Sequence, residues 1–155
     1  MSDIAAPTLT HVFDVEAEVG PPIEVCQSFA GERRVIPILG GRVSGPRLQG
    51  RVLPGANDYQ IIRAPGVLDL QARYIIEAAD GPLIFVENNG MRVGPPDIME
   101  RQRRGEAVDP ALIYFRAVPR FETGATEYQW LMRRLFICSA IRQPSAVLLR
   151  FFEVG

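Results

Sequence analysis

The chain has 155 residues, of which 47% are hydrophobic and 23% are charged, and its formal net charge is −1. These values fit one soluble globular domain and exclude a disordered chain, and no apolar run approaches the ~18 residues of a membrane helix. The first residues lack a signal-peptide pattern and no basic footprint favours nucleic acid, so we expect a cytoplasmic protein without a membrane or nucleic-acid partner.

Alternating apolar and polar side chains predict β-strands from the N-terminal part of the chain onward. We expect a flexible tail over residues 1–7 and a first strand over 9–19. Short strand-like runs follow at 23–29 and 33–39. The glycines of 40–45 indicate bulges or tight barrel corners, because no GxGxxG motif, lysine or helix pattern accompanies them.

A long β-hairpin over residues 66–89 follows a shorter hairpin over 48–63, and it turns at Asp80-Gly81. The first arm has one apolar face and one charged face. The apolar face comprises Leu68, Leu70, Ala72, Tyr74, Ile76 and Ala78, and the other face comprises Val67, Asp69, Gln71, Arg73, Ile75 and Glu77. The pattern leaves open whether the charged face contacts solvent or lines an enclosed cavity.

One short helix is predicted near residues 97–104, with an acid in its first turn and arginines in its last. Strands over 112–121, 128–139 and 146–154 complete the chain. About eight to ten strands with one minor helix would leave exposed edges in an open sheet. We therefore predict a mainly β fold, a single antiparallel β-barrel domain over residues 8–155.

The sequence lacks several residue types that particular catalytic and metal sites require. All 17 basic residues are arginine, which removes Schiff-base and P-loop lysine chemistry. We expect Cys26 and Cys138 to be buried thiols and His11 to be structural, since no Cys/His cluster accompanies them. We therefore expect neither a metal nor a cofactor.

Four motifs occur in the order typical of a known family: GGRVSGPRLQGRVLPGANDYQ, LDLQARYIIEAADGPLIFVENNG, YFRAVPRFET and YQWLMRRLF. Over residues 8–154 the chain resembles domain of unknown function 3237 (DUF3237), also called uncharacterised protein family 0311 (UPF0311). The resemblance implies a compact barrel similar in shape to the calycins, such as the lipocalins, and no assigned activity. The family pattern falls on Gly45, Pro46, Gly50, Asp58, Asp69, Arg73, Tyr74, Asp80-Gly81, Gly90, Phe115-Arg116, Phe121-Glu122-Thr123 and Trp130-Leu131. Departures at Tyr59, Met132 and residues 137–139 imply a different ligand if those positions face the lumen.

The charged residues on this pattern are the candidates for a site. Asp69 and Arg73 share a strand face but lie about 13 Å apart, four residues at a rise of ~3.3 Å, so each needs a partner from another strand. Asp58, Arg116 and Glu122 are the candidate partners. An enclosed set of this kind would form either a structural ion-pair network or a binding and acid–base site.

Three hypotheses about function follow. In the first, the barrel binds a small, partly polar organic molecule, such as a carboxylated or aromatic ligand, and Arg73 or Arg116 clamps a carboxylate or enolate oxygen. The rings that would cover an apolar part of the ligand are Tyr59, Tyr74, Tyr114 and Trp130.

In the second hypothesis, the protein is a cofactor-independent isomerase, lyase or hydratase, with Asp69 or Glu122 as general base and an arginine stabilising the oxyanion. In the third, compatible with both, the apolar face that starts at Leu68 forms a homo-oligomer interface.

Overall fold

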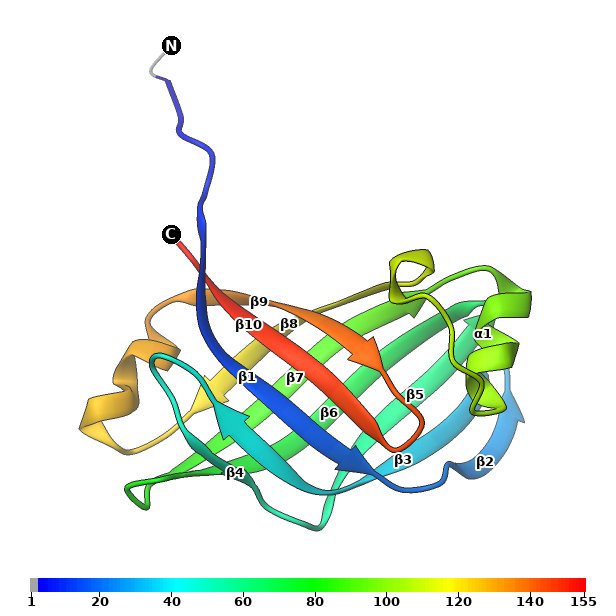
Figure 1. Cartoon of the computed structure of the whole chain (residues 1–155), viewed down its shortest axis with the longest axis horizontal. Coiled ribbons are helices and arrows are strands. Elements are labelled where there is room, and N and C mark those ends of the chain that lie inside the picture. The colour runs from blue at the N-terminus through cyan, green and yellow to red at the C-terminus, as the bar shows by residue number, and fades with distance from the viewer. Residues whose placement is uncertain (1–2) are drawn as a thin grey trace.

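Ten β-strands, each antiparallel to its neighbours, form one sheet in the computed structural model, which describes residues 3–155 (Figure 1). The strands are β1 (Leu9–Val19), β2 (Ile23–Ser28), β3 (Gly31–Ser44), β4 (Gly50–Val52), β5 (Ala56–Ala64), β6 (Val67–Ala78), β7 (Leu83–Val93), β8 (Tyr114–Glu122), β9 (Leu135–Arg142) and β10 (Ala146–Val154). One α-helix, α1 (Pro96–Arg103), and two 3-10 helices, η1 (Pro110–Leu112) and η2 (Thr126–Met132), complete the fold. Within residues 3–155, no helix is long and apolar enough to cross a membrane.

The sheet closes into a barrel because β1 pairs with β10 on one side and with β3 on the other. The order around the ring is β1, β10, β9, β8, β7, β6, then β4 and β5 sharing one position, then β3. β2 pairs with β3 alone and lies outside the ring. The ring therefore has eight strand positions, which confirms the predicted mainly β barrel with one short α-helix.

Glycines permit the close approach of β1 and β3 at the closure. The register between the two strands shifts next to Gly40, as expected for a bulge. A Cβ atom added at Gly41 would lie 2.2 Å from the carbonyl oxygen of Glu16. No side chain fits that space, so the glycines mark a barrel corner, as predicted.

The predicted long hairpin is the best-paired part of the ring. β6 and β7 pair continuously from Val67 opposite Val93 to Glu77 opposite Leu83. The turn contains Gly81, whose φ of 107° lies in the region that favours glycine. This confirms the hairpin and its turn.

The seam between β8 and β9 is the shortest in the ring. It pairs at only two positions, Arg116 opposite Ser139 and Ala117 opposite Cys138. Pro119 on β8 has no backbone N–H to donate. A groove of about 900 Å³ runs along the outer surface beside this seam, between Tyr114 and Ile141.

The predicted strand over 128–139 is wrong in its first half. Residues Thr126–Met132 form η2, and β9 begins only at Leu135. Tyr128, Trp130 and Met132 alternate like a strand, but the helical turn instead buries Leu131, which is 2% exposed. The hydroxyl of Tyr128 donates a hydrogen bond of 2.6 Å to Asp80 Oδ1, so η2 is held against the β6–β7 turn.

The apolar face of every long strand points into the barrel. On β6 this face starts at Leu68, which is buried, so the expectation that it forms an outer oligomer interface is wrong. At the η2 end, aromatic rings fill the interior. They are Phe13, Phe121, Phe136 and Phe151, with Trp130 packed against Phe136. The opposite end, beside α1, is not filled in this way.

Residues 3–8 have no regular secondary structure and extend away from the barrel in Figure 1. Residues 1 and 2 of the predicted tail lie outside the described residues. The division into a tail over 1–7 and a domain over 8–155 stays a prediction.

The two cysteines differ in burial. Cys138 on β9 is a buried free thiol, as predicted, whereas Cys26 on β2 is exposed, so the expectation of a buried thiol is wrong there. Cys26 is exposed because β2 lies outside the ring.

Candidate binding site: an arginine-lined barrel lumen

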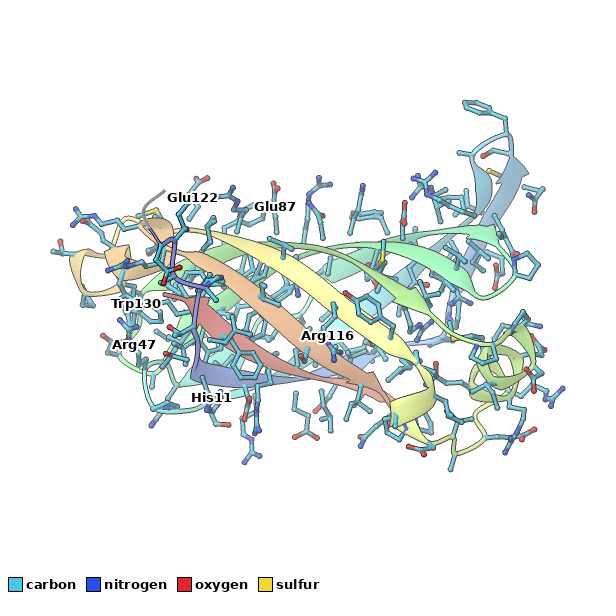
Figure 2. The ribbon with its side chains drawn as sticks, turned by 90° about the horizontal axis from the view of Figure 1, so that it is seen from above. His11, Arg47, Glu87, Arg116, Glu122 and Trp130 are labelled. Carbon is cyan, nitrogen blue, oxygen red and sulfur yellow. The ribbon has the colours of Figure 1, made fainter. Side chains whose placement is uncertain are left out.

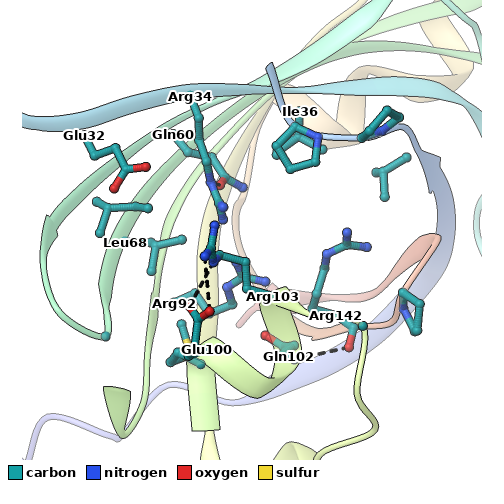
Figure 3. A pocket seen from close by; sticks show the side chains of 18 of the residues that line it. Glu32, Arg34, Ile36, Gln60, Leu68, Arg92, Glu100, Gln102, Arg103 and Arg142 are labelled. Atoms are coloured by element: carbon teal, nitrogen blue, oxygen red, sulfur yellow. Dashed lines mark hydrogen bonds and ion pairs between the residues drawn. The ribbon is translucent and has the colours of Figure 1, made fainter. Parts of the chain in front are cut away.

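A cavity of about 680 Å³ opens at the end of the barrel next to α1 (Figure 3). Its wall comes from β3, β5, β7, the corner after β9, and α1 itself. A smaller cavity of about 60 Å³ lies deeper in the lumen. Ile36, Gln60, Arg92 and Arg142 line both cavities, so these residues stand where the outer space meets the inner one.

Three arginines project into this space from the inward-facing positions of their strands (Figure 3). Arg34 lies on β3, Arg92 on β7 and Arg142 at the end of β9. Arg34 is 5% exposed and Arg92 is 6% exposed, while Arg142 is partly exposed. Buried arginines are uncommon and normally have an ionic or hydrogen-bonded partner.

A hydrogen-bonded chain holds the first arginine. Arg34 Nε donates to Gln60 Oε1 at 2.8 Å, and Gln60 Nε2 donates to Asp58 Oδ2 at 2.8 Å. The backbone N–H of Gln71 donates to the other Asp58 oxygen at 3.0 Å. Asp58 thus orients Gln60, which in turn orients Arg34.

The other two arginines lack a hydrogen-bonded chain of this kind among the described residues. Arg92 Nε is buried without any hydrogen-bond acceptor, and its guanidinium carbon lies 5.7 Å from the Phe115 ring centroid. Arg142 Nη1 donates to the carbonyl oxygen of Ala146 at 3.1 Å and to that of Gln143. Among residues 3–155, no acidic oxygen lies within 4.0 Å of a nitrogen of Arg34, Arg92 or Arg142.

Burial is the main cause of the pKa shifts in the lumen. Burial, with the nearby charges of Arg34 and Arg142, lowers the pKa of Arg92 to about 10. Burial also lowers the pKa of Arg34 and of Arg142. Burial raises the pKa of Asp58, although Gln60 and the Gln71 N–H act against that shift. At the mouth of the cavity Glu32 also lies in the wall, and Glu100 and Arg103 form an ion pair there. The arginines still outnumber the carboxyl groups along the two cavities, so the lumen is electropositive.

Two of the predicted site residues lie in this lumen. Asp58 belongs to the hydrogen-bonded chain, and Tyr74 is buried deeper, beside the inner cavity. Tyr59 occupies the alternate position on β5 and points away from the face that carries Asp58 and Gln60. Trp130 lies at the opposite, filled end, where the Arg47 guanidinium stacks 3.6 Å from its ring centroid (Figure 2).

The predicted charged cluster faces solvent, and the structure corrects the expectation that it lines the lumen. Asp69 pairs with Arg63, and Arg73 Nε lies 3.7 Å from Glu87 Oε1, both on the outer surface. Arg116 and Glu122 are also exposed on the outer face of β8 (Figure 2). The physical reason is desolvation, because an enclosed barrel buries the apolar face of each strand and leaves the charged face in water.

Several polar residues on the strands face the two cavities and were not predicted from the sequence. They include Arg34, Gln60, Asn88, Arg92 and Arg142. The three arginines could have been found from strand alternation, because each alternates with apolar residues, as Arg34 does with Ile36 and Ile38. A charged residue in such a register either ends the buried part of a strand or lines an internal polar site.

No group of three or more His, Cys, Asp or Glu side chains within residues 3–155 is arranged to hold a metal ion. The polar chemistry of the lumen therefore rests on guanidinium, amide, phenol and carboxyl groups. These groups can bind an anion, orient it by hydrogen bonds, and exchange a proton through Asp58.

Fold and cavity together define a closed eight-position β-barrel with an electropositive lumen open at one end. A family model described as "Protein of unknown function (DUF3237)" matches residues 7–154, and the chain belongs to this family. The UPF0311 protein blr7842 of Bradyrhizobium diazoefficiens is 45% identical over 150 residues, which cover 96% of this chain and 98% of that one.

Solved structures share the fold over nearly the whole chain. The crystal structure of the conserved protein of unknown function RPA1785 from Rhodopseudomonas palustris has a TM-score of 0.92 and 42% identity, covering 99% of this chain and all of that chain. A β-barrel-like protein from Acinetobacter baumannii has a TM-score of 0.87 and 31% identity, with complete coverage of both chains. These neighbours establish the barrel and the family.

Proposed function

We propose that the barrel binds a small organic anion in its lumen, held by Arg34, Arg92 and Arg142. The observation that supports this most directly is that three inward-facing arginines line one cavity without an ion-pair partner among residues 3–155. Buried charge of one sign is unfavourable in an empty site, and an anion would neutralise it. A guanidinium group also matches the two oxygens of a carboxylate geometrically.

The lining of the cavity favours an anion with an apolar part. Below the arginines, the inner cavity is walled by side chains such as Leu70, Phe115 and Leu149. A cavity of about 680 Å³ lies within the range of ~300–1,000 Å³ typical of small-molecule sites. The proposal keeps the ligand class expected from the sequence and replaces Arg73 and Arg116 with the three luminal arginines.

The test is calorimetric titration of simple anions, namely benzoate, phenylacetate, hexanoate and benzenesulfonate. We expect Arg92→Gln and Arg142→Gln each to weaken binding about tenfold or more, since a hydrogen bond to a charged group contributes roughly 1.5–3 kcal/mol. Arg73→Gln and Arg116→Gln make the same chemical change on the outer face and should leave affinity unchanged. Equal losses in the inner and outer variants, or no loss in the inner ones, would contradict the proposal.

A second function, cofactor-independent acid–base catalysis, is favoured by the raised pKa of Asp58 beside the arginines. In this version Asp58 removes a proton from carbon next to a carbonyl group, and Arg34 or Arg92 stabilises the enolate oxygen that forms. This assigns the general-base role to Asp58 in place of Asp69 or Glu122.

Proton exchange tests the second function without knowledge of the natural substrate. Phenylpyruvate in D₂O should lose its C3 protons to deuterium faster with the protein than without it, as followed by NMR. Asp58→Asn should abolish the acceleration, and Asp69→Asn, on the outer face, should keep it. An acceleration that survives Asp58→Asn would remove Asp58 from the role.

A further inference from the structure

The floor of the inner cavity carries two polar groups that the arginines do not explain. Tyr74 is 5% exposed and Asn88 is 4% exposed. The Tyr74 hydroxyl and Asn88 Oδ1 are both buried, and within residues 3–155 neither has a hydrogen-bond partner. An unsatisfied buried polar group costs roughly 1–3 kcal/mol, so two such groups on one cavity wall point to an occupant that bonds to them.

Small side chains leave space above these two groups. Ala17, Ala72 and Ala117 line the inner cavity from three different strands. Larger residues at these positions would fill the lumen, as the phenylalanines do at the η2 end. The inner cavity therefore exists because small alanine side chains occupy these positions.

Strand register places the two floor groups side by side and away from the arginines. Asn88 on β7 pairs with Ala72 on β6, and Tyr74 lies two residues further along the same face of β6. Arg92 lies four residues from Asn88 on the same face of β7, about 13 Å along the strand at ~3.3 Å per residue. A ligand that reaches both levels needs two polar ends separated by an apolar spacer.

A hydroxyl group is the ligand end that suits this floor. It can donate a hydrogen bond to Asn88 Oδ1 and accept one from the Tyr74 hydroxyl at the same time. It also suits the opposite orientation of the Asn88 amide, because it can then accept from the amide nitrogen instead. Burial raises the pKa of Tyr74, which keeps the phenol protonated as a donor.

We infer that the ligand is a hydroxylated organic acid, with its anionic group at Arg92 and Arg142 and its hydroxyl at Tyr74 and Asn88. The inference rests on the proposed function and narrows its ligand class. Simple acids without a distal hydroxyl fill only the arginine end. A site built to bond a hydroxyl discriminates against analogues that lack it, because its own polar groups are then left unpaired.

The experiment compares matched acids with and without the hydroxyl by calorimetry. The pairs are 4-hydroxybenzoate with benzoate and 6-hydroxyhexanoate with hexanoate. We expect at least one hydroxylated acid to bind the unaltered protein about fivefold or more tightly than its parent, the effect of roughly one net hydrogen bond. In Tyr74→Phe this preference should disappear while the affinity of the parent acid stays the same.

Tyr114→Phe provides the matched control, since Tyr114 is exposed on the outer face of β8. It should keep both the affinity and the hydroxyl preference. Parent acids that bind through Arg92 without any hydroxyl preference would overturn this inference and leave the proposed function standing; the two floor groups would then be bonded by buried water alone. Failure of every acid to bind would overturn both.

Discussion

At the residue scale, burial disfavours the charged form of both Arg92 and Asp58. Arg92 is held in a position where burial and two neighbouring arginines all disfavour its charge. Asp58 lies in the same lumen, and burial disfavours its charge as well. A bound anion would stabilise the charged form of Arg92 and the protonated form of Asp58. Stability lost at a binding site in this way is a common compromise between stability and function.

Asp58 leads to a prediction about the pH dependence of binding. Its pKa in the folded protein is raised above 3.8, and a bound anion nearby would raise it further. Binding should therefore take up a proton, and affinity should fall as the pH rises through the raised pKa of Asp58. Benzenesulfonate is a suitable probe because it stays ionised throughout, and Arg34 and Arg92 stay charged as well.

The measurement is a calorimetric titration of benzenesulfonate at a series of pH values. Asp58→Asn should bind with an affinity nearly independent of pH over the same interval. A flat profile in the unaltered protein, or the same slope in Asp58→Asn, would show that Asp58 does not titrate beside the ligand.

At the element scale, the ring depends on the contact between β1 and β3. Gly41→Ala would place a methyl group 2.2 Å from the Glu16 carbonyl, which belongs to backbone and cannot move aside alone. We expect a loss of about 1–3 kcal/mol in the free energy of unfolding, the usual cost of overpacking. Urea denaturation measures it. Gly124→Ala, where nothing lies within 4 Å, should change stability by less than about 0.5 kcal/mol.

Strand alternation made most elements predictable, and its limits are visible in particular residues. The hairpin of β6 and β7 was predictable because alternation and an Asp-Gly turn agree. The η2 segment was mistaken for a strand because Tyr128, Trp130 and Met132 recur at every second position by chance. The site was mislocated because Asp69 and Arg73 resemble functional residues in sequence, whereas Arg92 resembles an ordinary surface charge. Only closure of the barrel decides which face is enclosed, and closure depends on pairings distant in sequence, such as β1 with β3.

At the scale of the whole molecule, the two ends of the barrel differ. The η2 end is filled by phenylalanine rings and held by the Tyr128–Asp80 hydrogen bond. The α1 end carries the cavity, and Glu100 and Arg103 of α1 form an ion pair at its edge (Figure 3). A ligand bound as proposed enters and leaves past α1.

The short seam between β8 and β9 has a consequence for the motions of this barrel. With pairing at only two positions, the ring has one junction where backbone N–H groups lack the continuous ladder found between β6 and β7. Hydrogen–deuterium exchange should therefore be faster in peptides from β8 and β9 than in peptides from β6 and β7, because local opening there breaks fewer bonds. Equal protection around the ring would contradict this. Local separation of β8 from β9 would then connect the outer groove beside Tyr114 to the barrel interior for a short time.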